Sequence, residues 1–486
     1  MKIISYILFF IIPFCGFSQT DTVAHLYTFG GLNHDNAEGI DTTSDGGYIT
    51  VGATSSNSSG NTDIYLLKVD SNCTYQWSFA LGGTNNDLGY AVKQTFDKGF
   101  IIAASSNSTS NGGYKAVLYK RDSLGNHIWT KYYGGQDWSF AYDVVQTYDS
   151  GFVFCGETYN NTNGFSDVHI VKTNNIGDTL WTRTIGGALI DKGNAIIETS
   201  DSNIVVAGIK NTFTDSTQAY LIKLSANGTL LWDSIYGGVG YDVANAVIET
   251  NDLGFVIAGT NSEQVSNYDL DFWVLKTDVN GSEVWSSIFG DPGDEKAYDL
   301  LELANGKMFV VGSTEAHGAG GEDAKLFLVK PSGVWGGLGP TYGSVLDEGL
   351  KSISMNKSGG LCVAGYTSSY GIGNNDVLLI RLDTVVLDPD TTINVYEDAI
   401  PLVVKEFNKK SSVEIYPNPG HNYFMIKSLH KNIDKVKIID MYGRTVKELK
   451  VSLDSKNDIS DLKKGVYTLL FFEKWDLVNT SKLIKN

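Results

Sequence analysis

Acidic side chains recur at one position of a repeating sequence unit, and their type and spacing could bind a cation. Each stands five residues after a recurring glycine, and the third unit has Ser139 there instead. A collar of carboxylates could hold Ca²⁺, but one carboxylate per unit does not supply the six to eight oxygen ligands (roughly) that Ca²⁺ takes. We therefore expect these acids to accept backbone N–H groups where strands begin, with no metal or other cofactor bound. They are Asp35, Asp87, Asp191, Asp242, Glu295 and Glu348.

Aromatic residues that interrupt the repeat form a second candidate set. They lie in the longest and most varied segments, where an exposed ring could stack on a sugar or contact a protein partner. The alternative is that they anchor the loops by packing, as buried aromatics do. These ligand-face candidates are Trp138, Phe140, Tyr159, Phe165, Phe213, Tyr241 and Tyr268.

Catalytic motifs are missing from the chain. Arginine occurs four times, the histidines are scattered singly, and no G-x-S-x-G, P-loop, HExxH or CxxC pattern occurs. A pair of loop carboxylates could still cleave a glycoside, because the distance between two acids is not visible in a sequence. The sequence favours a protein that is not an enzyme, with a carbohydrate-active enzyme (glycosidase or lyase) as the alternative.

A glycine that follows an aromatic or aliphatic residue marks seven repeats of 51 to 53 residues. Each unit holds four short segments with period-two alternation, separated by Gly, Asn and Asp turns, which indicates four strands. A lone four-stranded sheet leaves its faces uncovered, and radial stacking buries them. We therefore predict an all-β fold with a seven-bladed β-propeller over residues 19–383. Its blades begin near residues 30, 82, 134, 186, 237, 290 and 343.

The last strand of each of the first five units carries a tryptophan five residues before the next marker glycine, as at Trp77 and Trp129. The seventh unit lacks this strand, whereas residues 24–29 stand in the same register before Gly30. We predict that residues 24–29 complete the seventh blade. In the sixth unit Trp335 lies too early, which predicts an irregular outer strand. The repeats resemble the bacterial β-propeller repeat family with D-x-A-x-x-V and G-x-T-S segments; the resemblance covers residues 24–383 and implies a fold alone.

The C-terminal part differs in composition from the repeats. Residues 384–411 are expected to be a linker, and residues 412–486 alternate in short strands, which predicts a small Ig-like β-sandwich. The motif positions of this segment are Tyr416, Pro417, Asn418, Pro419, Gly443, Gly465, Tyr467 and Lys482. With these residues in order, the segment resembles the type A C-terminal sorting domain of the Bacteroidetes type IX secretion system. The resemblance implies a partner in the secretion machinery, followed by release or surface attachment.

The N-terminus reads as an export signal. In residues 1–18 one lysine precedes a short apolar stretch and small residues follow, which is typical of a secretory signal peptide. Cys15 could suggest a lipoprotein, but bulky Phe14 fits that motif poorly. No other long apolar segment occurs, so we expect no transmembrane segment. The remaining cysteines, Cys73, Cys155 and Cys362, are expected to be small core residues.

A net charge of −18 argues against nucleic acid as a partner, because an acidic body repels phosphate. Together these features predict a monomer that is secreted or held at the outer cell surface. We expect it to bind glycan or protein through its variable loop face, without catalysis. A structural adhesion component with no small ligand is a further alternative.

Overall fold

The computed structural model describes residues 22–382 apart from residues 57, 109–112, 161–163, 214–216, 263–268, 319, 338, 340 and 357–358. It also describes residues 393–395 and residues 413–485 apart from 417–421, 429–432, 434, 440–444, 451–455 and 474–475. In this part of the chain every regular element is a β-strand, from β1 to β37. None of it forms a helix of the length and apolar character needed to cross a membrane.

Six antiparallel sheets follow one another along the chain, each with its strands in sequence order. Sheet 1 holds β2 (Asp35–Thr42), β3 (Tyr48–Thr54), β4 (Asp63–Val69) and β5 (Tyr75–Leu81), and sheet 2 holds β6 (Asp87–Gln94), β7 (Phe100–Ser106), β8 (Lys115–Arg121) and β9 (His127–Tyr133). Sheet 3 holds β10 (Asp143–Gln146), β11 (Phe152–Thr158), β12 (Asp167–Thr173) and β13 (Thr179–Ile185), and sheet 4 holds β14 (Asp191–Glu198), β15 (Ile204–Asn211), β16 (Thr217–Leu224) and β17 (Leu230–Tyr236). Sheet 5 holds β18 (Val243–Glu249), β19 (Phe255–Asn261), β20 (Asp271–Thr277) and β21 (Glu283–Phe289), and sheet 6 begins with β22 (Glu295–Glu302), β23 (Met308–Thr314) and β24 (Asp323–Val329).

The outer edge of sheet 6 is irregular, as the early position of Trp335 predicts. Two short strands, β25 (Trp335–Gly337) and β26 (Thr341–Tyr342), share the edge of β24 in place of one continuous strand. The Trp335 ring stacks on Phe327 with a centroid distance of 5.1 Å. This tryptophan therefore packs against its own sheet and also meets Phe289 of sheet 5, with ring centroids 4.9 Å apart.

Sheet 7 combines the two ends of the repeat region. It contains β27 (Glu348–Met355), β28 (Leu361–Thr367) and β29 (Asp376–Leu382), followed by β1 (Thr22–Phe29) and β30 (Ile393–Val395). Strand β1 pairs antiparallel with β29, with Ala24 opposite Leu382 and Phe29 opposite Val377. Residues 24–29 thus lie beside the last repeat, where the register of the sequence places them.

In the stretch expected to be a linker, the described residues 393–395 form a strand. Strand β30 pairs parallel with β1, from Thr22 opposite Ile393 to Ala24 opposite Val395. An exposed sheet edge carries unpaired N–H and C=O groups, and a covering strand satisfies them. Residues 393–395 therefore cover part of the outer edge of sheet 7.

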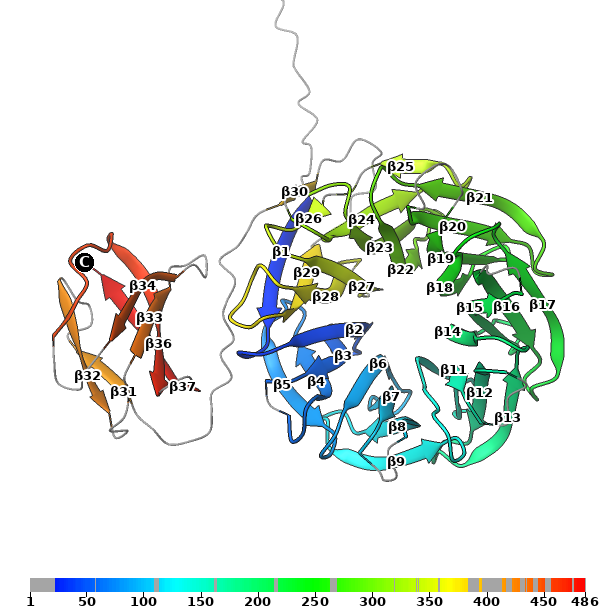
Figure 1. Ribbon diagram of the computed structural model, residues 1–486, viewed down its shortest axis with the longest axis horizontal. Coiled ribbons are helices and arrows are strands. Elements are labelled where there is room, and N and C mark those ends of the chain that lie inside the picture. Colours follow the sequence, from blue (N-terminus) through cyan, green and yellow to red (C-terminus); the bar gives the residue numbers. More distant parts are fainter. Residues whose placement is uncertain are drawn as a thin grey trace, which may run out of the picture.

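The seven sheets are arranged around a common centre, with first strands innermost and fourth strands outermost (Figure 1). This propeller-like arrangement explains the burial pattern. Strands β7, β11, β19 and β23 are buried along their whole length because both faces are covered by neighbouring sheets. One core cluster joins Val51 and Leu66 of sheet 1 to Ile102 of sheet 2. Each such side chain contributes about 1.5–3 kcal/mol when fully buried.

Tryptophans on the outer strands connect adjacent sheets. Trp129 meets Phe152 of the next sheet edge-on, with ring centroids 5.9 Å apart. The same indole covers Gly177, whose φ is +82°, in the β12–β13 turn. A Cβ on Gly177 would lie 3.0 Å from the indole, so glycine serves both the turn and the contact. The repeated tryptophan therefore packs between sheets.

The C-terminal region forms two further sheets. One contains β31 (Val413–Tyr416), β32 (Tyr423–Ser428) and β35 (Asn457–Asp458), and the other contains β34 (Thr445–Lys450), β33 (Lys435–Ile439), β36 (Gly465–Glu473) and β37 (Asp476–Lys485). Phe424 and Ile426 of the first sheet share one core with Val436, Leu469 and Phe471 of the second. Two sheets around a common apolar core make a small sandwich.

Candidate functional site

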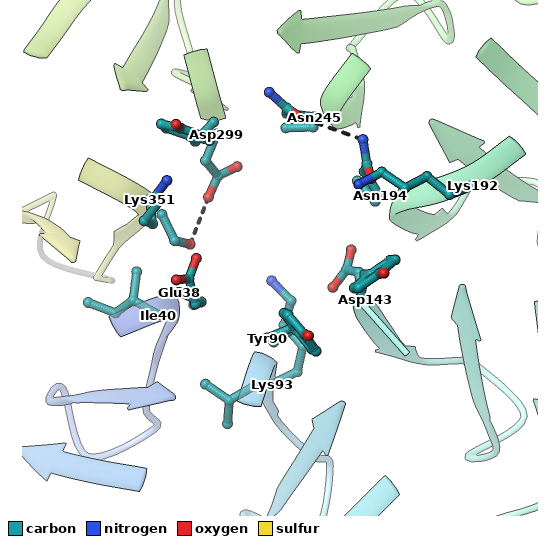
Figure 2. Close-up of a pocket in the computed structure, with 18 residues that line it drawn as sticks. Glu38, Ile40, Tyr90, Lys93, Asp143, Lys192, Asn194, Asn245, Asp299 and Lys351 are labelled. Atoms are coloured by element: carbon teal, nitrogen blue, oxygen red, sulfur yellow. Dashed lines mark hydrogen bonds between the residues drawn. The ribbon is translucent and has the colours of Figure 1, made fainter. Parts of the chain in front are cut away.

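A cavity of about 310 Å³ lies at the centre of the propeller-like ring. All seven sheets contribute to its lining through the residues of their innermost strands or the segment just before (Figure 2). The lining mixes carboxylates, ammonium groups, amides and phenols. Its labelled members are Glu38, Ile40, Tyr90, Lys93, Asp143, Lys192, Asn194, Asn245, Asp299 and Lys351.

A bulge in the innermost strand of six sheets, all except sheet 3, turns one side chain toward this cavity. The pairing register shifts between Ala37 and Gly39, which leaves Glu38 as the extra residue, and Tyr90 is extra in the same way in sheet 2. Such a bulge adds one residue to one strand and re-aims its side chain. In sheets 1, 2, 4 and 5 the positions on both sides of the bulged residue are glycine or alanine, while the bulged residue differs between sheets. The other bulged positions are Asn194, Asn245, Tyr298 and Lys351.

Lys93 places a positive charge among three acids of this cavity region. Burial lowers the pKa of Lys93, but Asp41, Asp143 and Asp299 more than offset this effect, so its pKa is raised. Burial raises the pKa of Asp143 to about 6, against the attraction of Lys93. Burial also raises the pKa of Asp299 and of Asp41. The positive charge at the centre is therefore the Lys93 ammonium group, and the carboxyl groups of the surrounding aspartates oppose it.

These acids also tie neighbouring sheets together. Asp143 of sheet 3 accepts the N–H of Ile196 in sheet 4 at 2.9 Å. Asp299 of sheet 6 accepts the N–H of Ile353 in sheet 7 at 3.0 Å. Because backbone bonds occupy the carboxylates, their positions are fixed before any ligand arrives. This fixed geometry suits orientation of a polar ligand.

Aromatic rings form a continuous path from the surface to the cavity. Trp138, 49% exposed, contacts Phe140 with a centroid distance of 6.4 Å. Phe140 stacks on Tyr142 at 5.8 Å, and Tyr142 meets Tyr90 edge-on at 5.0 Å. Tyr90 and Tyr142 both line the cavity. A ring bound on Trp138 would therefore lie at the start of an apolar path that ends among the polar groups.

The structure brings together three of the seven aromatic candidates from the sequence. Trp138, Phe140 and Tyr159 form one cluster, with Trp138 and Tyr159 centroids 6.2 Å apart. The N–H of Tyr159 donates to the Trp138 carbonyl at 2.8 Å. This bond joins the loop between β9 and β10 to the loop between β11 and β12. The other candidates lie elsewhere: Phe165, Phe213 and Tyr241 are exposed at separate positions, and Tyr268 falls outside the described residues.

The repeated acids lie away from solvent at the joints between sheets. Asp35, Asp87, Asp191, Asp242, Glu295 and Glu348 are all buried. Gly31 N–H donates to Asp35 at 2.7 Å, and Ser344 N–H donates to Glu348 at 2.8 Å. These bonds favour the structural interpretation of the acids. In the described ranges, no three His, Cys, Asp or Glu side chains gather where a metal ion could be held.

Sequence reasoning missed the ring of bulged residues. Its members occupy one repeat position and differ in chemistry, from Glu38 to Tyr90 to Lys351. The sequence signal that could have revealed them is a position that varies between units inside an otherwise regular innermost strand. The extra residue of a bulge, however, cannot be told from ordinary alternation without the partner strand.

The C-terminal region matches a known family, the secretion system C-terminal sorting domain. The match covers residues 414–486. Residues 414–486 are a type IX secretion sorting domain. The protein is therefore exported to the cell surface or secreted, and this domain implies interaction with the secretion machinery.

Within the sorting domain, the described motif positions lie on strands. Tyr416 ends β31 and is partly exposed, and Gly465 begins β36. The hydroxyl of Tyr467 donates to the Lys463 carbonyl at 2.8 Å. Lys482 lies on β37 opposite Thr468. The positions Pro417, Asn418, Pro419 and Gly443 fall outside the described residues.

No curated protein matches the chain. Several solved structures are similar to it. The WD40 domain of Pan2 from Neurospora crassa has a TM-score of 0.43 at 13% identity, covering 75% of this chain and 96% of that one. A protein of unknown function from Bacteroides caccae has a TM-score of 0.37 at 12% identity, covering 56% and 88%. A protein of unknown function from Dyadobacter fermentans has a TM-score of 0.42 at 10% identity, covering 75% and 98%.

Proposed function

We propose that this protein is a non-catalytic glycan-binding protein of the outer cell surface or the secreted fraction. In this proposal residues 1–18 are a signal peptide that is removed, and the sheets are the blades of a seven-bladed propeller closed by residues 24–29. The sorting domain, an Ig-like sandwich, directs export. The single observation that carries the binding role is the aromatic path from exposed Trp138 to Tyr90 at the central cavity.

A sugar chain suits this path for two physical reasons. Aromatic faces stack on the apolar faces of sugar rings, and an exposed indole offers the largest such face. Beyond the aromatic rings, fixed carboxylates, amides and the Lys93 ammonium offer hydrogen-bond partners to hydroxyl groups. The cavity volume of about 310 Å³ lies at the small end of the range for ligand sites, as expected for one or two sugar units.

The experiment is binding of the exported chain to a glycan array and to polysaccharide affinity gels. We expect Trp138→Ala to weaken the binding constant about tenfold or more, as loss of an aromatic anchor does. Phe96→Ala is the matched control, because Phe96 is 63% exposed but lies in the turn between β6 and β7, away from the candidate loops. No retention of the wild-type chain by any glycan, or equal losses for both variants, would remove this proposal.

The same samples separate the proposal from the enzyme alternative. Asp143, with a pKa of about 6, is the cavity acid whose protonation would suit acid catalysis. Its oxygens accept the N–H groups of Val144 and Ile196, which favours a structural role. Product release from a polysaccharide panel that disappears in Asp143→Asn would favour a glycosidase or lyase instead.

A further inference from the structure

Two cysteine thiols meet at the joint between sheet 1 and sheet 7. Cys73 lies in the turn between β4 and β5, and Cys362 lies on β28. Their sulfur atoms are 3.8 Å apart, although 289 residues separate them in the sequence. Both side chains are fully buried. The third cysteine, Cys155, is also buried but lies on β11 in sheet 3.

The surrounding contacts hold both cysteines in place. Cys73 and Cys362 share one core cluster with Tyr48, Val69 and Ala364. This cluster contains residues of both sheets, so the sulfur contact is part of their packed interface. An apolar, closely packed interface leaves the two side chains few alternative rotamers.

Polar contacts fasten the Cys73 turn to sheet 7. The guanidinium group of Arg381 on β29 donates to the Ser71 carbonyl at 3.2 Å and to Asn72 Oδ1 at 2.7 Å. Across the same joint, the Asn356 side chain donates to the Tyr48 hydroxyl at 2.9 Å. The two sulfur atoms therefore face each other across an interface that is anchored on several sides.

We propose that Cys73 and Cys362 form a disulfide bond in the exported protein and that it joins the first sheet to the last. A disulfide needs the sulfurs about 1.8 Å closer than in this structure, a change within reach of side-chain rotation and small backbone shifts. The sorting domain sends the chain out of the cytoplasm, into compartments where disulfides form and persist.

The bond forms by thiol–disulfide exchange. One thiolate attacks a disulfide of an oxidising thiol–disulfide exchange protein, and the second thiolate then displaces that protein from the mixed disulfide. The two cysteines lose two protons and two electrons, and the oxidant's disulfide is reduced to a dithiol. Burial raises the pKa of Cys362, so its thiolate is scarce in the closed interface. Exchange therefore occurs as sheet 7 docks onto sheet 1, before the interface closes.

In this position the proposed bond would hold the last sheet of the repeats to the first. Strands β27–β29 come from the far end of the repeats, and they are linked to the N-terminal side of the ring through the pairing of β29 with β1. If β1 separated from β29, the Cys73–Cys362 bond would still hold β28 against sheet 1. The disulfide is thus a covalent second closure of the ring.

The test is a count of thiols in the full exported chain, produced in an oxidising periplasm and purified without reductant. The chain is denatured, treated with iodoacetamide and digested. We expect one alkylated cysteine, Cys155, and one linked pair of peptides containing Cys73 and Cys362. Three alkylated cysteines in the mature chain, or a linkage that involves Cys155, would overturn the proposal.

Two variants complete the test. Cys155→Ala should leave no cysteine open to alkylation before reduction, and Cys362→Ser should leave two. Dithiothreitol should lower the melting temperature of the wild-type chain but not that of Cys362→Ser. An equal response of both proteins to the reductant would contradict the proposed bond. The thiol count rests on the wild-type chain, so it remains decisive even if a variant folds poorly.

Discussion

At the scale of single residues, the joints between sheets hold acids in close pairs. Asp376 and Asp35 are both buried, and a Cβ on Gly30 would lie 2.0 Å from one carboxylate and 2.9 Å from the other. Glycine is therefore required at this marker position by the acids that flank it. Burial first, then the charge of Asp35, raises the pKa of Asp376 to about 7.

This pairing predicts how stability depends on pH. Because the pKa of Asp376 in the folded protein exceeds that of an unfolded aspartate, about 4, the folded chain retains a proton that the unfolded chain releases. The free energy of unfolding therefore falls as pH rises from about 4 to about 7. We expect Asp376→Asn to raise the free energy of unfolding at pH 8 by about 1–3 kcal/mol, because an amide can donate toward Asp35.

Chemical denaturation at pH 5 and pH 8 measures this effect, with Asp178→Asn as the control. Asp178 pairs with Lys131 at the surface, and this contact lowers the pKa of Asp178. Asp178 therefore stays ionised from pH 5 to pH 8. A wild-type chain equally stable at both pH values, with an Asp376→Asn variant no more stable at pH 8, would contradict the pairing argument.

At the scale of elements, the outer strands of sheets 1 to 5 each place a tryptophan against a turn of the next sheet. Trp129 of β9 lies against Phe152 and over Gly177. We expect Trp129→Ala to lower the free energy of unfolding by about 3 kcal/mol, because it opens a cavity between sheets 2 and 3. Urea denaturation measures the loss.

Trp138→Ala provides the matched comparison, since the same side chain is truncated at a position that is half exposed. Its cost should stay below about 1 kcal/mol, as for substitutions of exposed residues. Similar losses for the two tryptophans would show that packing between sheets is not what the repeated tryptophan supplies.

At the scale of the whole molecule, the first strand pairs with the last sheet of the repeat region. Without β1, the outer edge of β29 would expose unpaired backbone groups and the apolar side chains now covered by Leu26 and Phe29. We expect deletion of residues 19–29 to lower the melting temperature and to cause aggregation. Deletion of residues 1–18 alone is the control and should leave the melting temperature unchanged.

Thermal unfolding followed by light scattering tests this expectation. The deletion removes pairing from Ala24 to Phe29 and also the strand on which β30 pairs. A truncated chain that melts at the wild-type temperature and does not aggregate would show that the first strand does not hold the last sheet in place.

Periodicity by itself predicted four strands per unit, which sheets 1 to 5 show, and the pairing of residues 24–29 with the last repeat, because alternation and turn residues are local signals. The sorting domain was likewise predictable from Tyr416, Gly465 and Tyr467 in order. Only the tertiary structure decided which side chains enter the cavity and that Cys73 meets Cys362. Bulges depend on pairing with a second strand, and a contact across 289 residues depends on how seven sheets stack around one centre.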